Sequence, residues 1–373
     1  MTTAYLDHAA TTPMRPEAVA AMLPFLTERF GNPSGSHSVA RSARAALDEA
    51  REVVAAALGA KPGQVVLTGG GTEADNLAIC GVHAALGGKV VCSAAEHHAV
   101  LHATRAVGGE VVPVDSTGVV DMDALAAALT PDTRLVSVML ANNETGVVTP
   151  LQEVVAAVRE RSPEALVHTD AVQAFPWLDV ATEAAGADLV AVSAHKFGGP
   201  KGVGALVVRD RVALRPILHG GGQERDRRSG THNVAGIVAM AAAARVTVEG
   251  RAETVARVGG LRDRLADGLL ASVEGALETG PRERKIAGNC HLRFPGVEAE
   301  ALLLLVDQAG VCASAGSACA SGAMEPSHVL LAMGLSREEA SSGVRLSLGW
   351  PSTSAEVDQA LTVLPKAVAH LRG

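Results

Sequence analysis

Short apolar runs alternate with Ala-rich amphipathic stretches from about residue 62 to residue 210. Seven of the runs have the length and the valine content of buried strands. They lie at Val65–Thr68, Lys89–Ser93, Glu110–Val114, Arg134–Met139, Ala165–His168, Asp188–Ser193 and Gly204–Val208. Helical periodicity falls between most of them, at Glu73–Leu86, Ala95–Val107, Asp121–Leu129 (with Asp121 as the expected N-cap) and Leu151–Arg161. This alternation predicts βαβ units and a mostly parallel sheet with helices on both faces.

The pattern changes after residue 210. Residues 234–276 predict a long helix with one Ala-rich face and one face rich in Arg and Glu. A smaller α+β unit is expected over about 277–373. Its predicted strands are His291–Phe294 and Val344–Leu348, and its predicted helices lie near Glu298–Ala309 and Ser354–Leu371.

The composition narrows the class of protein. With 48% hydrophobic and 19% charged residues, the chain is typical of a well-packed globular protein. A net charge of −8 argues against a nucleic-acid or anionic-membrane partner. The five cysteines are odd in number and show no paired spacing, which predicts neither a disulfide framework nor a structural zinc site. The N-terminus does not resemble a signal peptide and no apolar run is long enough to span a bilayer, so we expect a cytoplasmic protein.

Two charged side chains follow neighbouring apolar runs. Lys196 comes directly after one run, in Ser193-Ala-His-Lys196, and Asp170 follows another. The carboxyl ends of parallel strands meet at one edge of a sheet, so the amine and the carboxylate are expected close together. A lysine for covalent attachment, a carboxylate for a ring nitrogen and small phosphate donors are what pyridoxal phosphate (PLP) requires. Asp170 could instead simply cap a helix that begins near Ala171, and on such a helical turn Gln173 would share its face and reach the ring oxygen.

A glycine-rich segment, Thr68–Asn76, joins a predicted strand to a predicted helix. Glycine lets the backbone approach an anion, and the free N–H groups of a helix N-terminus favour phosphate, so Gly71 and Thr72 are candidate phosphate donors. Asn143 ends another strand within Asn142–Gly146. It is either part of a polar turn or a partner for the ring oxygen.

A histidine cluster allows two interpretations. His98 and His102 lie one helical turn apart, next to Glu96 and His97, which suggests zinc. Matching carboxylate and cysteine ligands are missing, so no metal site is predicted. His97 is better explained as a ring that stacks over the cofactor and takes part in proton transfer.

The C-terminal unit carries a thiol and a cation. Cys319 lies in a Ser/Ala/Gly-rich segment, Ser314–His328, which favours an accessible nucleophile over a buried structural cysteine. Arg345 lies in an apolar alternation, Gly343–Gly349. It is either half of a structural ion pair or a planar fork for a substrate carboxylate.

Together these segments resemble the class V aminotransferase family, and within it the cysteine desulfurases of the NifS/IscS kind. The resemblance runs nearly end to end and rests on an ordered set of motifs: Tyr5–Pro13, Gly31–His37, Gly70–Asn76, Glu96–Val100, Asn142–Gly146, the Asp170 and Lys196 segments, His219–Arg225, Arg228–Thr231, Gly316–Cys319 and Arg345–Gly349.

The resemblance implies a PLP fold type I enzyme and assigns its site residues. The cofactor contacts it implies are Lys196 for covalent attachment, His97 stacked on the ring, Asp170, Asn143 and Gln173 at the ring, and Gly71, Thr72, Ser193 and His195 at the phosphate. In a homodimer, Thr231 would reach the phosphate of the partner subunit. Cys319 would carry a persulfide, Arg345 would bind the substrate carboxylate, and Asn32 would lie near the substrate.

The same resemblance implies a domain division and an activity. A large PLP-binding domain would span residues 13–250, and residues 1–12 and 251–373 would form a small domain. The enzyme would convert L-cysteine to L-alanine and leave the sulfur on Cys319 for an acceptor protein: an iron–sulfur scaffold, a tRNA-thiolating enzyme or a biosynthetic sulfur carrier. Two alternatives stay open at this point. One is a selenocysteine lyase or another β-lyase on the same scaffold, and the other is a non-catalytic PLP-binding scaffold for sulfur trafficking.

Overall fold

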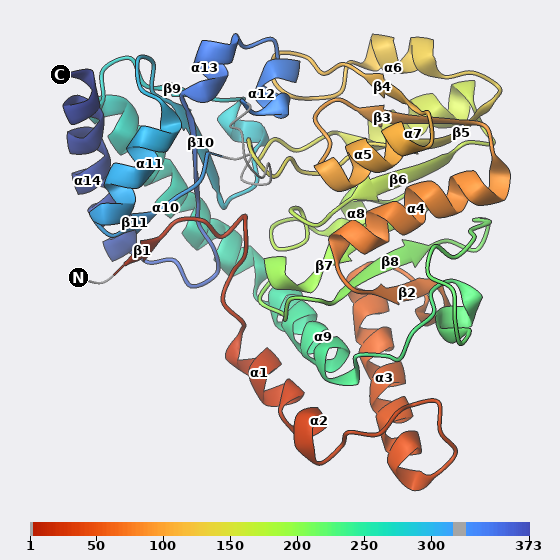
Figure 1. The fold of residues 1–373 in the computed structure, drawn as a ribbon. Helices are drawn as coiled ribbons and strands as arrows, with labels where there is room; N and C mark the ends of the chain where they lie inside the picture. The colour runs from red at the N-terminus through yellow and green to blue at the C-terminus, as the bar shows by residue number, and fades with distance from the viewer. Residues whose placement is uncertain (1–2, 316–325) are drawn as a thin grey trace.

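A computed structural model describes residues 3–315 and 326–373 of the chain. Its main feature is a seven-stranded sheet in the order β2-β8-β7-β6-β5-β3-β4 (Figure 1). The strands are β2 (Val65–Thr68), β3 (Lys89–Ser93), β4 (Glu110–Val112), β5 (Thr133–Ser137), β6 (Leu166–Asp170), β7 (Leu189–Ser193) and β8 (Gly204–Val208). β8 pairs antiparallel with β2 and β7, and the remaining pairs are parallel. The predicted mostly parallel sheet is confirmed.

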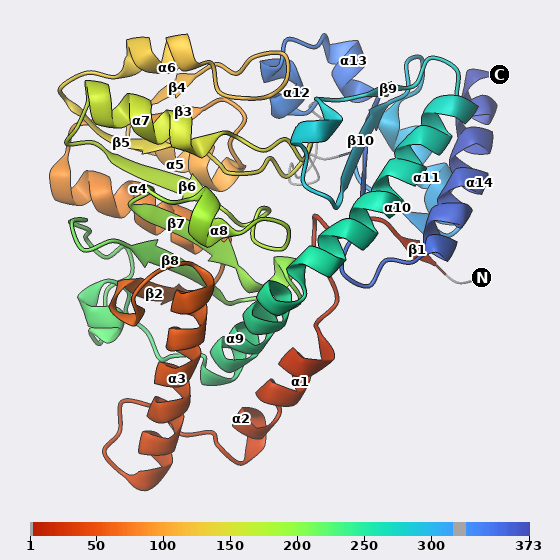
Figure 2. The same cartoon turned by 180° about the vertical axis from the view of Figure 1, so that it is seen from behind.

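Helices pack on both faces of this sheet, as expected where alternate strand residues point to opposite sides. Val66 faces a core shared with α4 (Gly71–Leu86) and α5 (His98–Ala106). Its neighbours Val65 and Leu67 face a larger core on the opposite side. The helices of that second face, seen from the front in Figure 2, are α3 (Ser38–Ala57), α6 (Met122–Ala128), α7 (Leu151–Arg161), α8 (Val180–Glu183) and α9 (Val234–Glu249).

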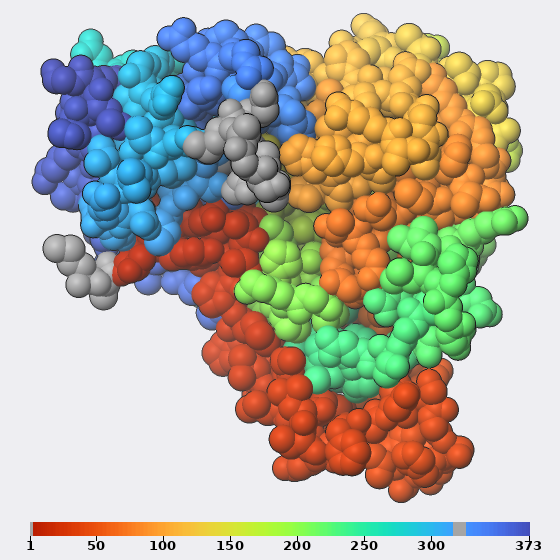
Figure 3. All heavy atoms as spheres, viewed as in Figure 1, coloured from red at the N-terminus to blue at the C-terminus, as the bar shows by residue number. Residues whose placement is uncertain are grey.

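The N-terminal segment has two parts. β1 (Ala4–Tyr5) pairs in parallel with β11 (Val311–Cys312), so the chain begins beside its C-terminal region. α1 (Pro16–Met22), α2 (Pro24–Thr27) and the start of α3 then form an arm that projects from the rest of the molecule (Figure 3).

A second, smaller sheet lies beside the first. It has the antiparallel order β12-β10-β9, formed by β9 (Leu277–Glu278), β10 (Asn289–Arg293) and β12 (Gly343–Ser347). One face of it packs on α10 (Arg251–Ser272), α11 (Ala299–Gln308) and α14 (Ser354–Arg372). Two short helices, α12 (His328–Ala332) and α13 (Arg337–Ser341), share a small core with Ala95 and Val114 of the large-sheet region. Figure 1 shows α13 above the small sheet. The described residues also contain four 3₁₀ turns: η1 (Pro62–Gln64), η2 (Ala194–Lys196), η3 (Gln223–Asp226) and η4 (Arg282–Arg284).

Several predicted elements differ from the structure. The single long helix expected over 234–276 is two helices, α9 and α10, which meet at Gly250. β6 continues to Asp170, two residues beyond the predicted end. The alternative in which Asp170 caps a helix from near Ala171 is wrong, because residues 172–177 form turns; the Asp170 side chain accepts a hydrogen bond from the Val172 N–H. The expected N-cap, Asp121, is confirmed.

Two findings bear on the larger organisation. The core of the seven-stranded sheet includes Ile286, and Trp177 packs against both this core and that of the small sheet. The proposed boundary at residue 250 therefore stays a prediction.

Within the described residues, no helix has both the length and the apolar character that crossing a membrane requires.

Candidate active site

The carboxyl edge of the large sheet brings together Asp170 and Lys196. Asp170 is the last residue of β6, and Lys196 ends the 3₁₀ turn η2 that follows β7, the neighbouring strand. The Lys196 Nζ donates hydrogen bonds to the carbonyl oxygens of Ala9 (2.5 Å) and Ala10 (2.9 Å). These carbonyls belong to the segment between β1 and α1, so three distant parts of the chain meet at the lysine amine.

Asp170 is buried, and its surroundings decide its charge. Its Oδ1 accepts a hydrogen bond of 2.8 Å from the Val172 N–H. Burial raises the pKa of Asp170 to about 6, although the hydrogen bond from Val172 and the charge of Lys196 act in the opposite direction. The hydrogen bond and the charge of Lys196 do not fully offset the effect of burial on Asp170. Its ionised form would therefore be stabilised by a further cationic partner at this position.

His97 lies beside Asp170 and is the N-cap of α5. Its Nδ1 accepts a hydrogen bond of 3.1 Å from the Ala99 N–H, so in the neutral ring the proton is on Nε2. Burial lowers the pKa of His97 to about 4, and the charges of Lys196, His328 and His102 add to this effect. At neutral pH the side chain is therefore an uncharged, flat ring.

The predicted phosphate donors converge at the N-terminus of α4. Gly70, the N-cap, has a φ of 147°, which L side chains rarely adopt. A Cβ added to Gly71 would lie 2.9 Å from the Val172 Cγ2 and 3.5 Å from the Ser193 Cβ, so this backbone packs directly against the ends of β6 and β7. The first N–H groups of this 16-residue helix, those of Gly71 and Thr72 among them, have no partner within the helix and are suited to an anion.

Two other predicted residues lie around the lysine. The Gln173 Nε2 donates a hydrogen bond of 2.7 Å to the Ala9 carbonyl, the same oxygen that Lys196 contacts. The His195 Nδ1 lies 3.2 Å from the Thr11 Oγ1, and burial followed by the charges of Lys196 and Lys201 lowers the pKa of His195 to about 4.

Arg345 reaches the site from the small sheet, on β12. Its Nη1 donates to the Asn143 carbonyl and its Nη2 to the Asp7 Oδ1, each at 2.8 Å. Arg345 thus forms an ion pair with Asp7, which is one of the two interpretations allowed by the sequence. Its guanidinium also lies beside Asn143, a predicted cofactor residue. Both interpretations of Arg345 remain compatible with this geometry.

Two predicted residues are not brought to this edge within one chain. Thr231 is exposed in the segment that precedes α9, and Asn32 is exposed in the loop of the arm between α2 and α3, where its Oδ1 accepts from the Ser34 N–H. Cys319 lies outside the described residues.

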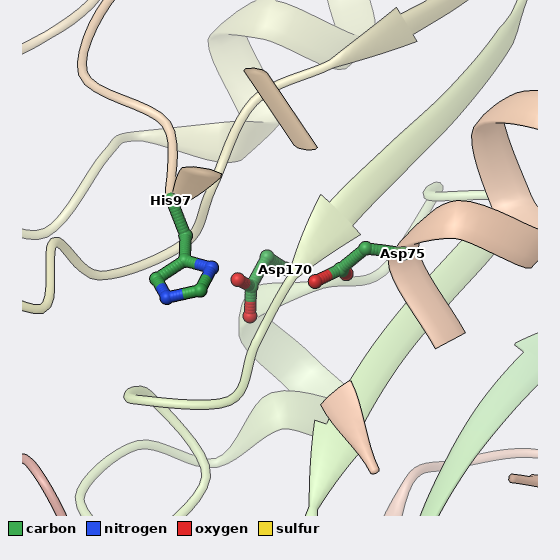
Figure 4. Close-up of side chains that lie close together, drawn as sticks. All are labelled: Asp75, His97 and Asp170. Carbon is green, nitrogen blue, oxygen red and sulfur yellow. The ribbon is translucent and has the colours of Figure 1, made fainter. Parts of the chain in front are cut away.

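Sequence reasoning missed Asp75 and His168. Among the described residues, the one cluster of acidic and imidazole groups close enough to hold an ion is Asp75, His97 and Asp170, whose ligand atoms lie within 4.8 Å of one another (Figure 4). His98 and His102, the pair that suggested zinc, are not part of it; their rings lie 4.9 Å apart and His98 stacks at 4.4 Å on His328. His168 precedes Asp170 by two residues in β6, and the two-residue period of a strand would have revealed that both face the same side.

The residues present fit PLP. A lysine amine, a buried carboxyl with an uncompensated charge, a neutral flat ring and a helix N-terminus that begins with glycine lie along one edge. The amine suits the aldehyde of that cofactor and the carboxyl suits its ring nitrogen. The flat ring suits the face of the cofactor ring, and the helix N-terminus suits the phosphate.

Comparisons with known proteins agree with this arrangement. Residues 4–360 match the aminotransferase class-V family. An IscS-like cysteine desulfurase from Mycobacterium tuberculosis is 46% identical, with 99% of this chain and 97% of that protein covered. Cysteine desulfurase IscS from Dictyoglomus turgidum is 43% identical, over 99% of this chain and 95% of its own length. A solved structure of a NifS-like protein superimposes with a TM-score of 0.93 at 35% identity, over 99% of this chain and 100% of that one.

The chain therefore belongs to the class-V aminotransferase family, and its fold is PLP fold type I. Within that family it is a PLP-dependent cysteine desulfurase, an enzyme that removes sulfur from L-cysteine. The family, fold class, cofactor and activity predicted from the sequence are confirmed.

Proposed function

We propose that the desulfurase reaction takes place at the carboxyl edge of the large sheet, with the residue roles that the sequence predicts. The observation that carries the proposal is the meeting of Lys196, Asp170 and His97 beside the N-terminus of α4. Bound PLP supplies an electron sink for the charge that develops on the substrate. Lys196 holds it covalently, and Asp170 pairs with its ring nitrogen.

The other cofactor contacts follow from their places around this edge. The N–H groups of Gly71 and Thr72, with the side chains of Ser193 and His195, bind the phosphate. Asn143 and Gln173 lie at the ring oxygen. Gln173 already donates to the carbonyl that Lys196 contacts, which supports its place beside the lysine end of the cofactor.

His97 covers the ring and donates a hydrogen bond from Nε2. Its Nδ1 is engaged by the Ala99 N–H, so the ring accepts a proton only when that hydrogen bond opens. A pKa of about 4 also makes it a weak base at neutral pH. We therefore assign His97 to stacking on the cofactor ring and to hydrogen-bond donation.

The sulfur atom passes to Cys319. The thiolate of Cys319 attacks the sulfur of bound L-cysteine, a new S–S bond forms, and the Cβ–S bond of the substrate breaks. The electron pair of the broken bond stays with the three-carbon fragment, which takes up protons and leaves as L-alanine. The persulfide on Cys319 then serves an acceptor protein of one of the three classes above. A structural relative, SspA, 31% identical, has been solved in complex with cysteine, which supports the substrate.

Arg345 binds the substrate carboxylate in this proposal. Replacement of Arg345 with lysine is expected to raise the KM for L-cysteine about tenfold or more, because one bidentate, charge-assisted contact is lost. Steady-state kinetics of alanine release measure the effect.

Asp7→Asn is the matched control, since it breaks the same ion pair but keeps the guanidinium. We expect this variant to leave the KM unchanged or lower it. A loss of thermal stability in both variants with unchanged KM in Arg345→Lys would show that Arg345 is only a structural partner of Asp7.

We further propose a homodimer in which the arm contacts the partner subunit. The arm exposes Leu23, Leu26 and Phe30, and Phe30 is 72% exposed. Such a group of apolar side chains is typical of an interface. Thr231 and Asn32 are both exposed in the single chain, as expected if each completes the site of the other subunit.

Phe30→Asp tests the homodimer. We expect the variant to sediment as a monomer and to bind PLP at least about tenfold more weakly, because it loses the partner's Thr231. Leu304→Asp is the control, because Leu304 is similarly exposed (61%) but lies on α11 in the small unit. Analytical ultracentrifugation and PLP titration of both variants decide the question; a dimeric Phe30→Asp protein contradicts this interface.

A further inference from the structure

A second carboxyl group, that of Asp75, lies behind Asp170 and has no role in the site described so far. Asp75 lies in α4, four residues after Gly71, and is 1% exposed. Figure 4 shows its carboxyl directed toward that of Asp170, with His97 on the other side of Asp170. One helix thus places its N-terminus at the phosphate end of the site and a carboxyl at the ring-nitrogen end.

A short row of polar groups lies next to Asp75. The His168 Nε2 lies 3.6 Å from the Asp75 Oδ1, and the His168 Nδ1 lies 2.8 Å from the Oγ of Ser137, its partner on β5. When the Ser137 hydroxyl donates to Nδ1, the His168 proton is on Nε2 and faces Asp75. Burial lowers the pKa of His168 to about 3, so this partner is neutral and does not cancel the charge of Asp75.

The charges around Asp75 are predominantly negative. The titratable groups that face it are Asp170 and His168 from β6 and Glu96 and His97 from the segment before α5. Burial raises the pKa of Asp75 well above its usual range, and the charges of Asp170 and Glu96 raise it further. Within the described part of the chain, Asp75 forms no ion pair with lysine or arginine, and its Oδ1 has no hydrogen-bond partner.

We propose that Asp75 is a positioning residue that acts with Asp170 to keep the PLP ring nitrogen protonated, and that His168, oriented by Ser137, presents its Nε2–H to Asp75 for this purpose. The inference rests on the proposed function, in which Asp170 faces that nitrogen. Two neighbouring carboxyls in a buried site resist ionising together unless a positive charge lies beside them. A protonated ring nitrogen is such a charge, so protonation of the ring and ionisation of the two carboxyls stabilise each other.

Asp75→Asn tests this, because it removes the charge and keeps the shape. The PLP-free protein is reconstituted with nitrogen-15-labelled PLP, and the chemical shift of the ring nitrogen is followed against pH. We expect the midpoint of its titration to fall by about one pH unit or more, which is about a tenfold loss of proton affinity. The Kd for PLP is expected to rise by a similar factor at neutral pH. Ser137→Ala is expected to shift the midpoint in the same direction by a smaller amount.

The PLP-free protein provides a second readout. The pKa of Asp75 is higher in the folded state than in the unfolded state, so the fold loses stability as the pH rises through the folded-state pKa. Asparagine carries no charge and escapes this loss. We therefore expect PLP-free Asp75→Asn to have a Tm at pH 8 equal to or above that of the wild type. A purely structural aspartate would give the opposite sign.

The Asp170→Asn variant distinguishes failure of the proposed function from failure of the inference about Asp75. If Asp170→Asn retains the wild-type titration of the ring nitrogen, the proposed pairing with Asp170 is wrong. If Asp170→Asn lowers the midpoint and Asp75→Asn titrates like the wild type, the role of Asp75 is wrong and the proposed function stands. If Asp75→Asn does not fold, the titration of the ring nitrogen in Ser137→Ala is the deciding measurement. A midpoint equal to that of the wild type then overturns the inference.

Discussion

Cys319→Ala is expected to lose both alanine release and enzyme-bound persulfide, with a fall in turnover of about 10³-fold or more. The variant keeps Lys196 and the other cofactor residues, so it should still bind PLP and L-cysteine. Without a thiol to attack the substrate sulfur, the Cβ–S bond has no acceptor for its sulfur atom. Alanine is measured by mass spectrometry of the supernatant, and the persulfide by the added mass of one sulfur atom on the intact protein.

Cys312→Ala is the matched control for this experiment. Cys312 is a free, partly exposed thiol on β11, and burial together with Asp307 raises its pKa, which makes it a poor nucleophile. We expect the control variant to form persulfide and alanine at the wild-type rate. Alanine release by Cys319→Ala at the wild-type rate would instead establish a lyase that does not use this thiol.

Lys196→Ala is expected to abolish covalent attachment of PLP and to lower turnover by about 10³-fold or more. In the proposed site the Lys196 amine attaches the cofactor, and the surrounding contacts cannot replace that bond. In the wild type, borohydride reduction followed by peptide mapping should find the cofactor on the peptide that contains Lys196. In the variant, PLP should be removed by gel filtration.

Lys201→Ala controls for the loss of a lysine near this edge. Lys201 is exposed five residues further on and lowers the pKa of His195 only through its charge. We expect this variant to keep the reducible cofactor and nearly full turnover. A cofactor trapped on any lysine other than Lys196 in the wild type would contradict the assignment.

Local patterns were sufficient for the elements of the large sheet. The strands β2, β3 and β8 and the helix α7 have the predicted bounds, because buried strands are short apolar runs and amphipathic helices have a clear period. The helix α3 was not predicted, although it spans 20 residues and packs on the core of the large sheet. The long helix was predicted across Gly250, since glycine weakens a helix without always ending it.

The sequence by itself determined the class of the protein and its cofactor, and it predicted which residues bind that cofactor. The tertiary structure decided how these residues interact. Lys196 and Asp170 follow adjacent strands, so topology alone brings them together. The contact of Lys196 with Ala9 and the pairing of Arg345 with Asp7 join residues that lie 187 and 338 positions apart in the chain. The place of Asp75 behind Asp170 likewise depends on how α4 packs against β6. No local pattern encodes such contacts, because their free energy arises only when distant segments are packed and desolvated together.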